Sequence, residues 1–588
     1  MANKKLFGST GVSAKSPATD TRNEAGGTAY SLEAKAAIAQ LAVTGCFNQT
    51  FYASAQDQLD KVKGLIEKVE PEFAGKLAIY ARTHGFMKDM PAFIVGWLTG
   101  KLTVAHKIVE GLHKAGADKA KIAASEEKIH ELSAILWDTF PRVVDNGKML
   151  RNYVQIIRSG VTGRKSLGSS PRRLIRSWFD TKTDEQVFYN SIGNDPTLGD
   201  VVALAHPAPG TKERAALYGY LLGKTLGKFE DRDFVVTDEL PAIVKTYEAF
   251  KKEPVGELPR APYEMLEGLP LTTAQWKELA LNATWQQTRQ HLNAFVKKGV
   301  FTGSKAGTWD MDVIKAVADK LRDEKAIEKA RVLPYQLLIA YTNMGPEMPV
   351  EITNALQDAM EIATKNVPVI DGLICVFPDI SGSMHSPVTG TRVNPKTGKT
   401  ESHTSKVSCI DIAALVAASL LRANPRTVII PFESKALTDV RLNPRDSIMT
   451  NAAKLRGLPC GGTNCASALD AVHRMGLKPD ICLYVSDNES WLDSPNYGAY
   501  SGHRSVWGSP GSVNQARSET LRLWDGLVRA NPKAKLVCLD VQPYATTQAP
   551  SRKDILNIGG FSDSVFEVIK QFYSGDASNW IEVIEKGM

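Results

Sequence analysis

The hydrophobic pattern of this chain changes at about residue 368, and the change constrains what the chain can fold into. Before it, from 30 to 365, apolar residues recur on one stripe in segments typical of amphipathic helices. After it, short β-branched apolar runs alternate with helical stretches, which predicts a parallel sheet with helices on both faces. The expected strands are 373–377, 427–432, 481–485 and 535–541, and the expected helices are 409–422, 464–475 and 513–530.

Together the two patterns predict a multi-domain protein of the α + α/β class. A chain of 588 residues is too long for one hydrophobic core. Short paired helices without strands favour an α-solenoid of HEAT-like repeats, although no strict sequence period is visible. We expect a flexible N-terminal tail over 1–22, helical repeats over 23–367 and an α/β domain over 368–588.

Composition narrows the class of protein only a little. The formal net charge of +7 is a mild basic excess, which fits nucleic-acid binding and also an ordinary balanced surface. The first residues lack the apolar core of a signal peptide, and no run approaches the roughly 18 apolar residues of a membrane-spanning helix. We therefore expect a cytoplasmic protein with no membrane partner.

The cysteines indicate packing rather than cross-linking or zinc binding. Their number is seven, and Cys375, Cys482 and Cys538 lie in apolar strand-like runs. Buried reduced thiols are the expected state. Cys460 and Cys465 flank a Gly-Gly-Thr turn without a nearby histidine or second cysteine pair, so no zinc site is expected there.

Oxygen-bearing side chains gather where the expected strands end. The run 373–377 leads into Asp379-Ile380-Ser381-Gly382-Ser383, Thr463 follows a Gly-Gly turn, and Asp487 follows the run 481–485. The carboxyl ends of neighbouring parallel strands meet at one edge of a sheet, where open α/β sheets bind ligands. Hard oxygen donors suit a divalent cation, with Mg²⁺ expected first and Mn²⁺ or Ca²⁺ as alternatives. The predicted ligands are Asp379, Ser381, Ser383, Thr463 and Asp487.

Two other interpretations of these residues stay open. The hydroxyls of Ser381, Ser383 and Thr463 could cap helices, with Asp379 forming a turn. A metal-dependent hydrolase would need more carboxylates and a base, and His385 is the one candidate base. We expect no catalytic residues and no enzyme.

The motifs resemble those of two known modules. The strand followed by Asp-Ile-Ser-Gly-Ser-Met, the later Gly-Gly-Thr and the later Ser-Asp-Asn resemble the von Willebrand factor A domain and its metal-ion-dependent adhesion site. Six segments of the helical half resemble the TROVE module: 23–52, 77–98, 163–179, 199–209, 284–301 and 331–343. This layout is similar to that of the Ro ribonucleoprotein autoantigen family and its bacterial and phage relatives.

The resemblance implies a function in RNA quality control or processing. In that family the helical repeats close into a ring whose ends the A domain fastens. The ring binds small noncoding Y RNAs on its outer face and single-stranded 3′ ends of misfolded RNAs in its central hole. In bacteria a Y RNA can tether the protein to an exoribonuclease. We expect a monomeric ribonucleoprotein with Y-like RNA, misfolded RNA ends and an exoribonuclease or other protein as partners.

A basic cluster supports an RNA role independently of the resemblance. Its members fall around a Pro-started helix: Arg164, Lys165, Arg172, Arg173 and Arg176. Such a cluster can neutralise phosphates, although a solvated helix face has the same composition. Arg289 and His291, beside Lys297 and Lys298, form a weaker candidate patch.

His206 matches a histidine that contacts Y RNA in the family. A histidine before a proline is as often a helix-terminal residue that bonds a free carbonyl. The stretch 188–200 departs from the animal members, because it holds no basic residue where they carry several. That departure puts the usual Y RNA contact in doubt or moves it to the Arg172–Arg176 cluster.

A second function class remains: a metal-dependent scaffold whose A domain captures an acidic residue of a protein partner. RNA binding weakens steeply with salt, whereas metal-mediated capture is lost with chelator. The basic segment 386–406 after the metal motif is expected to be a mobile loop that admits partners.

Overall fold

The structure is a computed structural model of the whole chain. It describes all residues except 1–17, 24–25, 45–46, 48–53, 86, 194, 226–238, 306, 331, 333, 389–390, 394–399, 403–406, 488–517, 543, 545, 561–564, 576–579 and 588. Most of the expected tail and part of the expected loop 386–406 therefore lie outside the described residues.

The first half of the chain folds into helices, as its hydrophobic stripe predicts. From α1 to α10 they are α1 (Ala34–Thr44), α2 (Ala55–Ile66), α3 (Pro71–Thr83), α4 (Asp89–Lys114), α5 (Lys119–Val143), α6 (Gly147–Ser159), α7 (Ser169–Asp180), α8 (Asp184–Tyr189), α9 (Leu198–Ala205) and α10 (Lys212–Thr225). They continue with α11 (Ala242–Lys252), α12 (Tyr263–Leu266), α13 (Thr273–Asn282), α14 (Trp285–Lys297), α15 (Met311–Leu321), α16 (Glu324–Lys329), α17 (Pro334–Thr342), α18 (Val350–Ala363) and the 3₁₀ turn η1 (Thr364–Asn366).

Capping boxes show why several helices begin where they do. Thr272 before α13 accepts a hydrogen bond from the Gln275 N–H, and the Gln275 side chain accepts one from the Thr272 N–H. Thr284 and Gln287 repeat the arrangement at the start of α14. Each box satisfies two backbone donors that the helix itself leaves without a partner, so a Thr-x-x-Gln sequence marks a helix start.

The second half forms a five-stranded parallel sheet in the order β10-β8-β7-β3-β6. Its strands are β3 (Ile374–Pro378), β6 (Val428–Ile429), β7 (Ile481–Ser486), β8 (Lys535–Asp540) and β10 (Ile555–Gly559). The helices are α19 (Cys409–Ala423), α20 (Ile448–Arg456), α21 (Cys465–Arg474), α22 (Glu519–Ala530), α23 (Val565–Ser574) and α24 (Trp580–Lys586), with the 3₁₀ turn η2 (Gly382–His385) and the hairpin β4 (Thr391–Val393) and β5 (Thr400–Ser402). The predicted α + α/β class is confirmed; β10 is a strand that the hydrophobic pattern did not predict.

Helices cover both faces of this sheet. Residues of α19 join the larger core together with Val376 and Leu483, whereas α21 and α22 join a second cluster with Phe377 and Tyr484. Because neighbouring residues of a strand point to opposite faces, β3 and β7 are buried along their whole lengths. Burial on both faces explains why the sequences of these two strands are almost entirely apolar.

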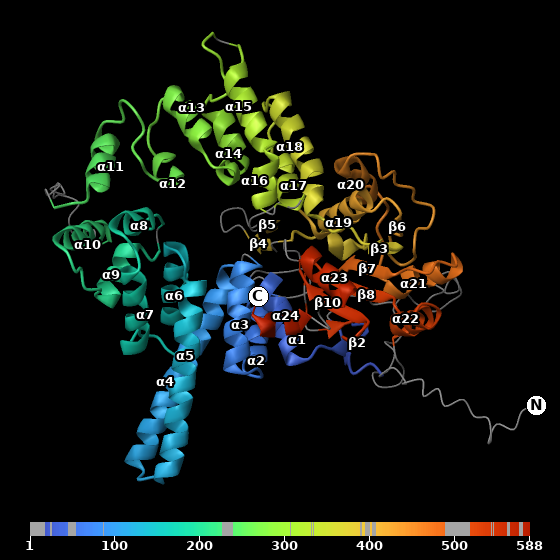
Figure 1. Cartoon of the computed structure of the whole chain (residues 1–588), viewed down its shortest axis with the longest axis horizontal. Helices are drawn as coiled ribbons and strands as arrows, with labels where there is room; N and C mark the ends of the chain where they lie inside the picture. Colours follow the sequence, from blue (N-terminus) through green and yellow to red (C-terminus); the bar gives the residue numbers. More distant parts are fainter. Residues whose placement is uncertain are drawn as a thin grey trace, which may run out of the picture.

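The helical half curves round so that both of its ends meet the α/β domain (Figure 1). At one end the N–H of Ile370 donates to Asn424 Oδ1 (2.9 Å), and the N–H of Ile448 donates to Glu361 Oε1 (2.8 Å). At the other end α1 lies against β10, since a Cβ added to Gly559 would stand 2.5 Å from Gln40 Cβ. The α/β domain thus joins the first and last helices of the curve.

The N-terminal residues cross into the α/β domain. β2 (Thr28–Ser31) pairs with β1 (Thr21–Arg22) on one side and with β9 (Thr546–Thr547) on the other. The Tyr30 side chain is buried in the second core cluster, and its hydroxyl accepts the N–H of Ser518 (3.0 Å). Residues expected to open the helical repeats, 28–31, therefore complete the other domain, and two residues of the expected tail form a strand.

Two further properties bear on the earlier expectations. No described helix is long and apolar enough to cross a membrane. The six described cysteines are free thiols, and all except Cys460 are buried. Burial raises the pKa of the Cys538 thiol to about 12, which keeps it protonated and unreactive at neutral pH.

Candidate metal centre and basic surface

The five predicted metal ligands lie on neighbouring parts of the sheet edge. Asp379 directly follows β3 and Asp487 directly follows β7, and these strands are paired with Pro378 opposite Val485. Since the strands run parallel, both carboxylates stand at their carboxyl ends. All five side chains are buried: Asp379, Ser381, Ser383, Thr463 and Asp487.

Hydrogen bonds hold the Asp-x-Ser-x-Ser loop against β7. The Asp379 N–H donates to the carbonyl of Val485 (3.0 Å). The Asp379 carboxylate accepts the Ser381 N–H on Oδ1 (2.8 Å) and the Ser486 hydroxyl on Oδ2 (2.6 Å). The hydroxyl oxygens of Ser381 and Ser383 are 3.3 Å apart, so both face the same small space.

The loop that carries Thr463 packs directly against this one. The Gly382 N–H donates to the carbonyl of Gly461 (3.0 Å). A Cβ on Gly461 would stand 2.0 Å from Glu433 Oε2, so a larger residue here would displace the Glu433 side chain. The Gly-Gly-Thr sequence therefore brings the Thr463 loop to the first loop, which is the juxtaposition that the motif order predicts.

The hydroxyls are not used as helix caps. Ser381 is the N-cap residue of η2, but its side chain makes no capping hydrogen bond. The N-cap residue of α21 is Asn464 rather than Thr463, and that helix also lacks a side-chain cap. The N-cap positions of these two helices therefore give no support to the interpretation in which the hydroxyls serve only to start helices.

The electrostatic potential at the site is negative. Burial, together with the charge of Asp487, raises the pKa of Asp379 from 3.8 to about 7. Burial and the charges of Asp487, Asp540 and Asp379 also raise the pKa of Cys409. Two carboxylates that repel each other among buried hydroxyls form a hard-oxygen donor set suited to a divalent cation.

Asp540 is a buried carboxylate that the sequence reasoning missed. It ends β8 and lies opposite Ser486 in the register, so three successive strands each place an aspartate at this edge. The sequence did contain a sign of it, because the apolar run 536–539 is followed directly by Asp540. Within the described residues, no group of three or more His, Cys, Asp and Glu side chains could hold a metal, so a cation at this site would need the hydroxyls as ligands.

The basic cluster divides into exposed and structural members. Lys165, Arg172 and Arg173 are exposed. Arg164 is partly buried and donates to the carbonyls of Ser166 (3.0 Å) and Leu167 (2.9 Å), so it shapes the loop before α7. Arg176 donates to the carbonyl of Ala205 (2.8 Å), which ends α9.

That last bond brings His206 to the basic cluster. His206 has a left-handed backbone (φ 51°), and its N–H closes α9 on the Val202 carbonyl (2.9 Å). It is thus the helix-terminal residue that its position before Pro207 predicts, yet its side chain is exposed. The exposed surface of Lys165, Arg172, Arg173 and His206 is hereafter called the α7 basic surface.

The weaker patch requires a correction. Arg289 is buried, and it donates to the carbonyl of Gln336 (2.7 Å) and to Gln286 Oε1 (3.0 Å). His291 lies against the Tyr263 ring and 3.3 Å from a Glu267 oxygen. These side chains hold α14 in place, so Arg289 is not a surface contact for phosphate.

The fold brings together a second group of positively charged side chains: Lys88, Lys148 and Arg82. Partial burial, then the charges of Lys148 and Arg82, lower the pKa of Lys88. Arg82 also pairs with Asp145 (2.9 Å). The sequence separates these residues by up to 66 positions, so no local pattern could have joined them.

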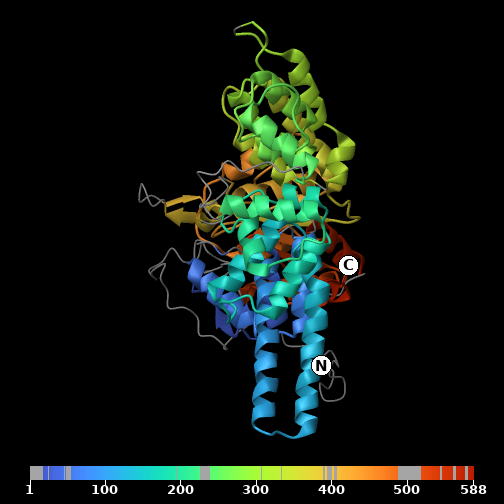
Figure 2. The same cartoon turned by 90° about the vertical axis from the view of Figure 1, so that its left-hand side faces the viewer.

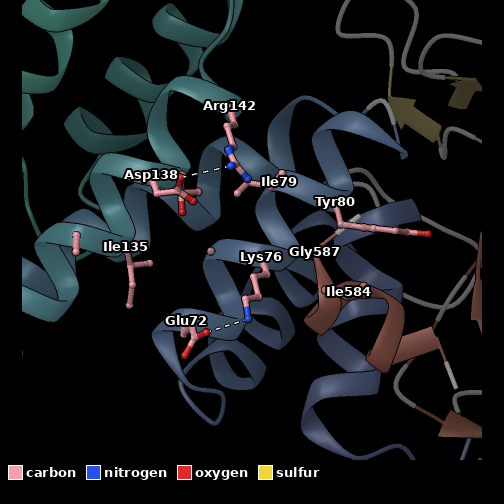
Figure 3. Close-up of a pocket in the computed structure, with 12 residues that line it drawn as sticks. Glu72, Lys76, Ile79, Tyr80, Ile135, Asp138, Arg142, Ile584 and Gly587 are labelled. Carbon is pink, nitrogen blue, oxygen red and sulfur yellow. Dashed lines mark ion pairs between the residues drawn. The ribbon is translucent and has the colours of Figure 1, made fainter. Parts of the chain in front are cut away.

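The described part of the chain also contains a cavity of about 390 Å³ between α3, α5 and α24. Figure 3 shows the ion pairs Glu72–Lys76 and Asp138–Arg142 on its two helical walls, with Ile584 from α24 beside them. None of the predicted site residues lines it, so the cavity is separate from both candidate sites.

Comparison with known proteins gives consistent results. Residues 373–510 match the family model of the Ro60 vWA domain. The chain is 23% identical to the RNA-binding protein RO60 of Deinococcus radiodurans over 94% of this chain and 95% of that protein. It is 22% identical to the RNA-binding protein RO60 of Caenorhabditis elegans over 46% of this chain and 38% of that protein.

The fold agrees with a solved structure. The crystal structure of the Deinococcus radiodurans RO (RSR) protein superposes with a TM-score of 0.56 at 18% sequence identity. The superposition covers 92% of this chain and all of the other. Both the helical half and the α/β domain thus have counterparts there.

Proposed function

Because this chain is similar to RO60 proteins of two organisms, one of them over 94% of its length, we propose that it is an RNA-binding protein that acts through binding rather than catalysis. The α7 basic surface carries the proposal. Arg172 and Arg173 are exposed on one helix, and Arg176 anchors that helix to the end of α9, where His206 is exposed. Cations held on packed helices neutralise phosphates at a low entropic cost, because the scaffold is already ordered.

The finer proposal concerns the kind of RNA. We assign the α7 basic surface to a structured noncoding RNA of the Y type, held on the outer surface. The curved helical half would receive single-stranded ends of misfolded RNAs in its centre. The mild excess of cations over the chain supports both modes, since the charge of RNA is spread along its backbone.

For the α/β domain we propose a divalent cation, Mg²⁺ first, held by the hydroxyls of Ser381, Ser383 and Thr463 with Asp379 and Asp487. Two carboxylates would balance the charge of such a cation, and five protein oxygens would leave one position of an octahedral cation open for an acidic group of a partner. The chain's own contribution is to orient these oxygens: Ser486 and the Ser381 N–H fix the Asp379 carboxylate. A protein partner, such as an exoribonuclease, is the second candidate ligand.

The test is purification of the full chain from its host without nuclease, followed by sequencing of the RNA that accompanies it. We expect one abundant small structured RNA, enriched over a variant with Arg172→Glu and Arg173→Glu. The absence of any RNA enriched over that variant would contradict the RNA proposal. Loss of a co-purified protein with chelator, while the RNA stays bound, would identify metal-dependent capture as a separate activity.

A further inference from the structure

The paired helices α4 and α5 extend well beyond the rest of the molecule (Figures 1 and 2). The large hydrophobic core reaches along α4 as far as Leu102. Beyond that point the two helices pack on each other, with Val109 buried. The distal part of this hairpin, residues 103–133, is hereafter called the arm; it contacts the body at its base, where Thr103 accepts a hydrogen bond from Arg164, and then extends away from it (Figure 2).

The arm carries a second apolar stripe, on α4. Val104 and Ile108 are 53% and 52% exposed, although both are large and β-branched. Gly111, at i+7, continues the stripe on α4, and Ala115, at i+11, is the C-cap residue that directly follows the helix. Half of the stripe is bulky and the other half is small.

Gly111 is unexplained by the chain's own packing. It lies inside a 26-residue helix, where glycine is less favourable than alanine. A Cβ added to Gly111 would find nothing within 4 Å. The space beside Gly111 is open, as it is beside Gly64 in α2, and next to the exposed Val104 and Ile108 it leaves room for a second helix to approach α4 closely.

We propose that the arm mediates self-association, with α4 of a second copy packed antiparallel on this stripe. A two-fold axis between positions 108 and 111 places Ile108 on Gly111 of the second copy and Val104 on its Ala115. Each bulky side chain then meets a small one. The same surface is used by both copies and fits itself, as a closed two-fold dimer requires.

Charge also favours a second copy. Residues 101–138 hold six lysines, no arginine and six acidic residues, so this hairpin is neutral in a chain of formal charge +7. The lysines of α4 in this region, Lys101, Lys107 and Lys114, exceed its one acidic residue, Glu110, and the acidic residues of α5 balance them, so long-range repulsion between two whole hairpins is small. The proposed dimer depends on neither the RNA proposal nor the metal proposal.

The primary test is sedimentation of the nucleic-acid-free full chain over a range of concentrations. A single helix pair buries less than the roughly 1,200 Å² of a stable interface, so a weak reversible dimer is expected. Ile108→Glu is expected to raise the dimer Kd by about tenfold or more, and Val255→Glu, at a valine that is 75% exposed elsewhere, to leave it unchanged. A monomer at all concentrations, or unchanged association of Ile108→Glu, would overturn the proposal.

Two glycine variants separate helix stability from association. Gly111→Ala and Gly64→Ala each add a methyl group at an open position inside a helix, so both should stabilise their helices. Only Gly111→Ala should weaken the dimer, because its methyl group occupies the space proposed for Ile108 of the second copy. Equal association of both variants and the parent would count against close helix contact.

Cysteine cross-linking tests the orientation. In a Cys460→Ser background, which removes the one exposed thiol among the six described cysteines, Ile108→Cys and Gly111→Cys proteins are mixed and oxidised. An antiparallel pair predicts cross-links mainly in the mixture, above the level of the background protein. Cross-links formed mainly by Ile108→Cys alone would show a parallel pair and overturn the proposed geometry. Unchanged circular dichroism of each variant establishes that it is folded.

Discussion

The Ser486 hydroxyl donates a 2.6 Å hydrogen bond to Asp379 Oδ2, across the ends of two adjacent parallel strands. Both residues are fully buried. The other oxygen of the carboxylate accepts the Ser381 N–H, so Asp379 is held in one orientation by two donors. Ser486 stands outside the Asp-x-Ser-x-Ser motif, yet it positions that motif's first residue.

Replacing Ser486 by alanine should therefore weaken both the fold and the site. A hydrogen bond to a charged group contributes about 1.5–3 kcal/mol, so we expect the free energy of unfolding to fall by about 2 kcal/mol. Calorimetry should also show weaker Mg²⁺ binding, because the carboxylate loses its fixed orientation. Ser467→Ala is the matched control: this buried serine donates to a backbone carbonyl, that of Asn464 (2.8 Å), rather than to a carboxylate. It should lose about 1 kcal/mol and leave Mg²⁺ affinity unchanged.

Cation-free protein should lose stability as pH rises toward 7. The pKa of Asp379 is raised from 3.8 to about 7 in the folded protein, so between these values the folded state binds a proton that the unfolded state does not. Stability therefore falls with rising pH across that window. Mg²⁺ should raise the Tm more at about pH 8 than at about pH 5, because protons compete with the cation only at the lower pH.

Asp379→Asn provides the control for this pH dependence. The amide removes the titrating group and its repulsion with Asp487, so the slope of stability between about pH 4 and pH 7 should become shallower. A parent protein whose Tm responds equally to Mg²⁺ at both pH values would contradict the assignment of the proton to this site.

The sequence predicts those parts of the fold that residues close together in the chain encode. β3, β7 and β8 are continuous apolar runs buried on both faces, so hydrophobicity alone predicts them. β10 has the sequence Ile-Leu-Asn-Ile-Gly. Its Asn557 is buried, where the side chain donates to the Ala549 carbonyl and accepts a hydrogen bond from the Thr547 hydroxyl. The pairing of β2 with β9 joins residues more than 500 positions apart, which no local pattern encodes.

The site residues show the same distinction. The placement of the Asp-x-Ser-x-Ser loop beside the end of β7 and the Gly-Gly-Thr loop could be predicted, because strand ends and glycine turns bring these segments together by topology. The expectation for Arg289 considered the charge of the residue but not its position around the helix. Trp285, Arg289 and Leu292 lie at i, i+4 and i+7 on the buried stripe of α14, so the residue's position places it inside.

Reversing the charges of the α7 basic surface should change how RNA affinity depends on salt. Each lost phosphate contact reduces the slope of log K against log salt by about 0.7–0.9. Arg172→Glu with Arg173→Glu should therefore lower the slope by up to about 2 and weaken binding several-fold. Lys121→Glu with Lys128→Glu makes the same charge change at exposed lysines of α5 and is the matched control. Equal slopes for the two double variants would contradict a local phosphate contact.

Arg289 and Arg172 should give opposite phenotypes, which separates structural arginines from binding ones. Arg289→Ala removes the donor to the Gln336 carbonyl and to Gln286 inside the packed α14 region. A buried acceptor left without a donor costs about 1–3 kcal/mol, so thermal or denaturant unfolding should detect a loss of that size. RNA affinity of the folded variant should be unchanged. Arg172→Ala should keep the parent's stability, because the side chain is exposed, and should bind RNA more weakly in a gel shift. If Arg289→Ala instead lost RNA affinity at full stability, the buried arginine would have to reach RNA through a rearrangement of α14.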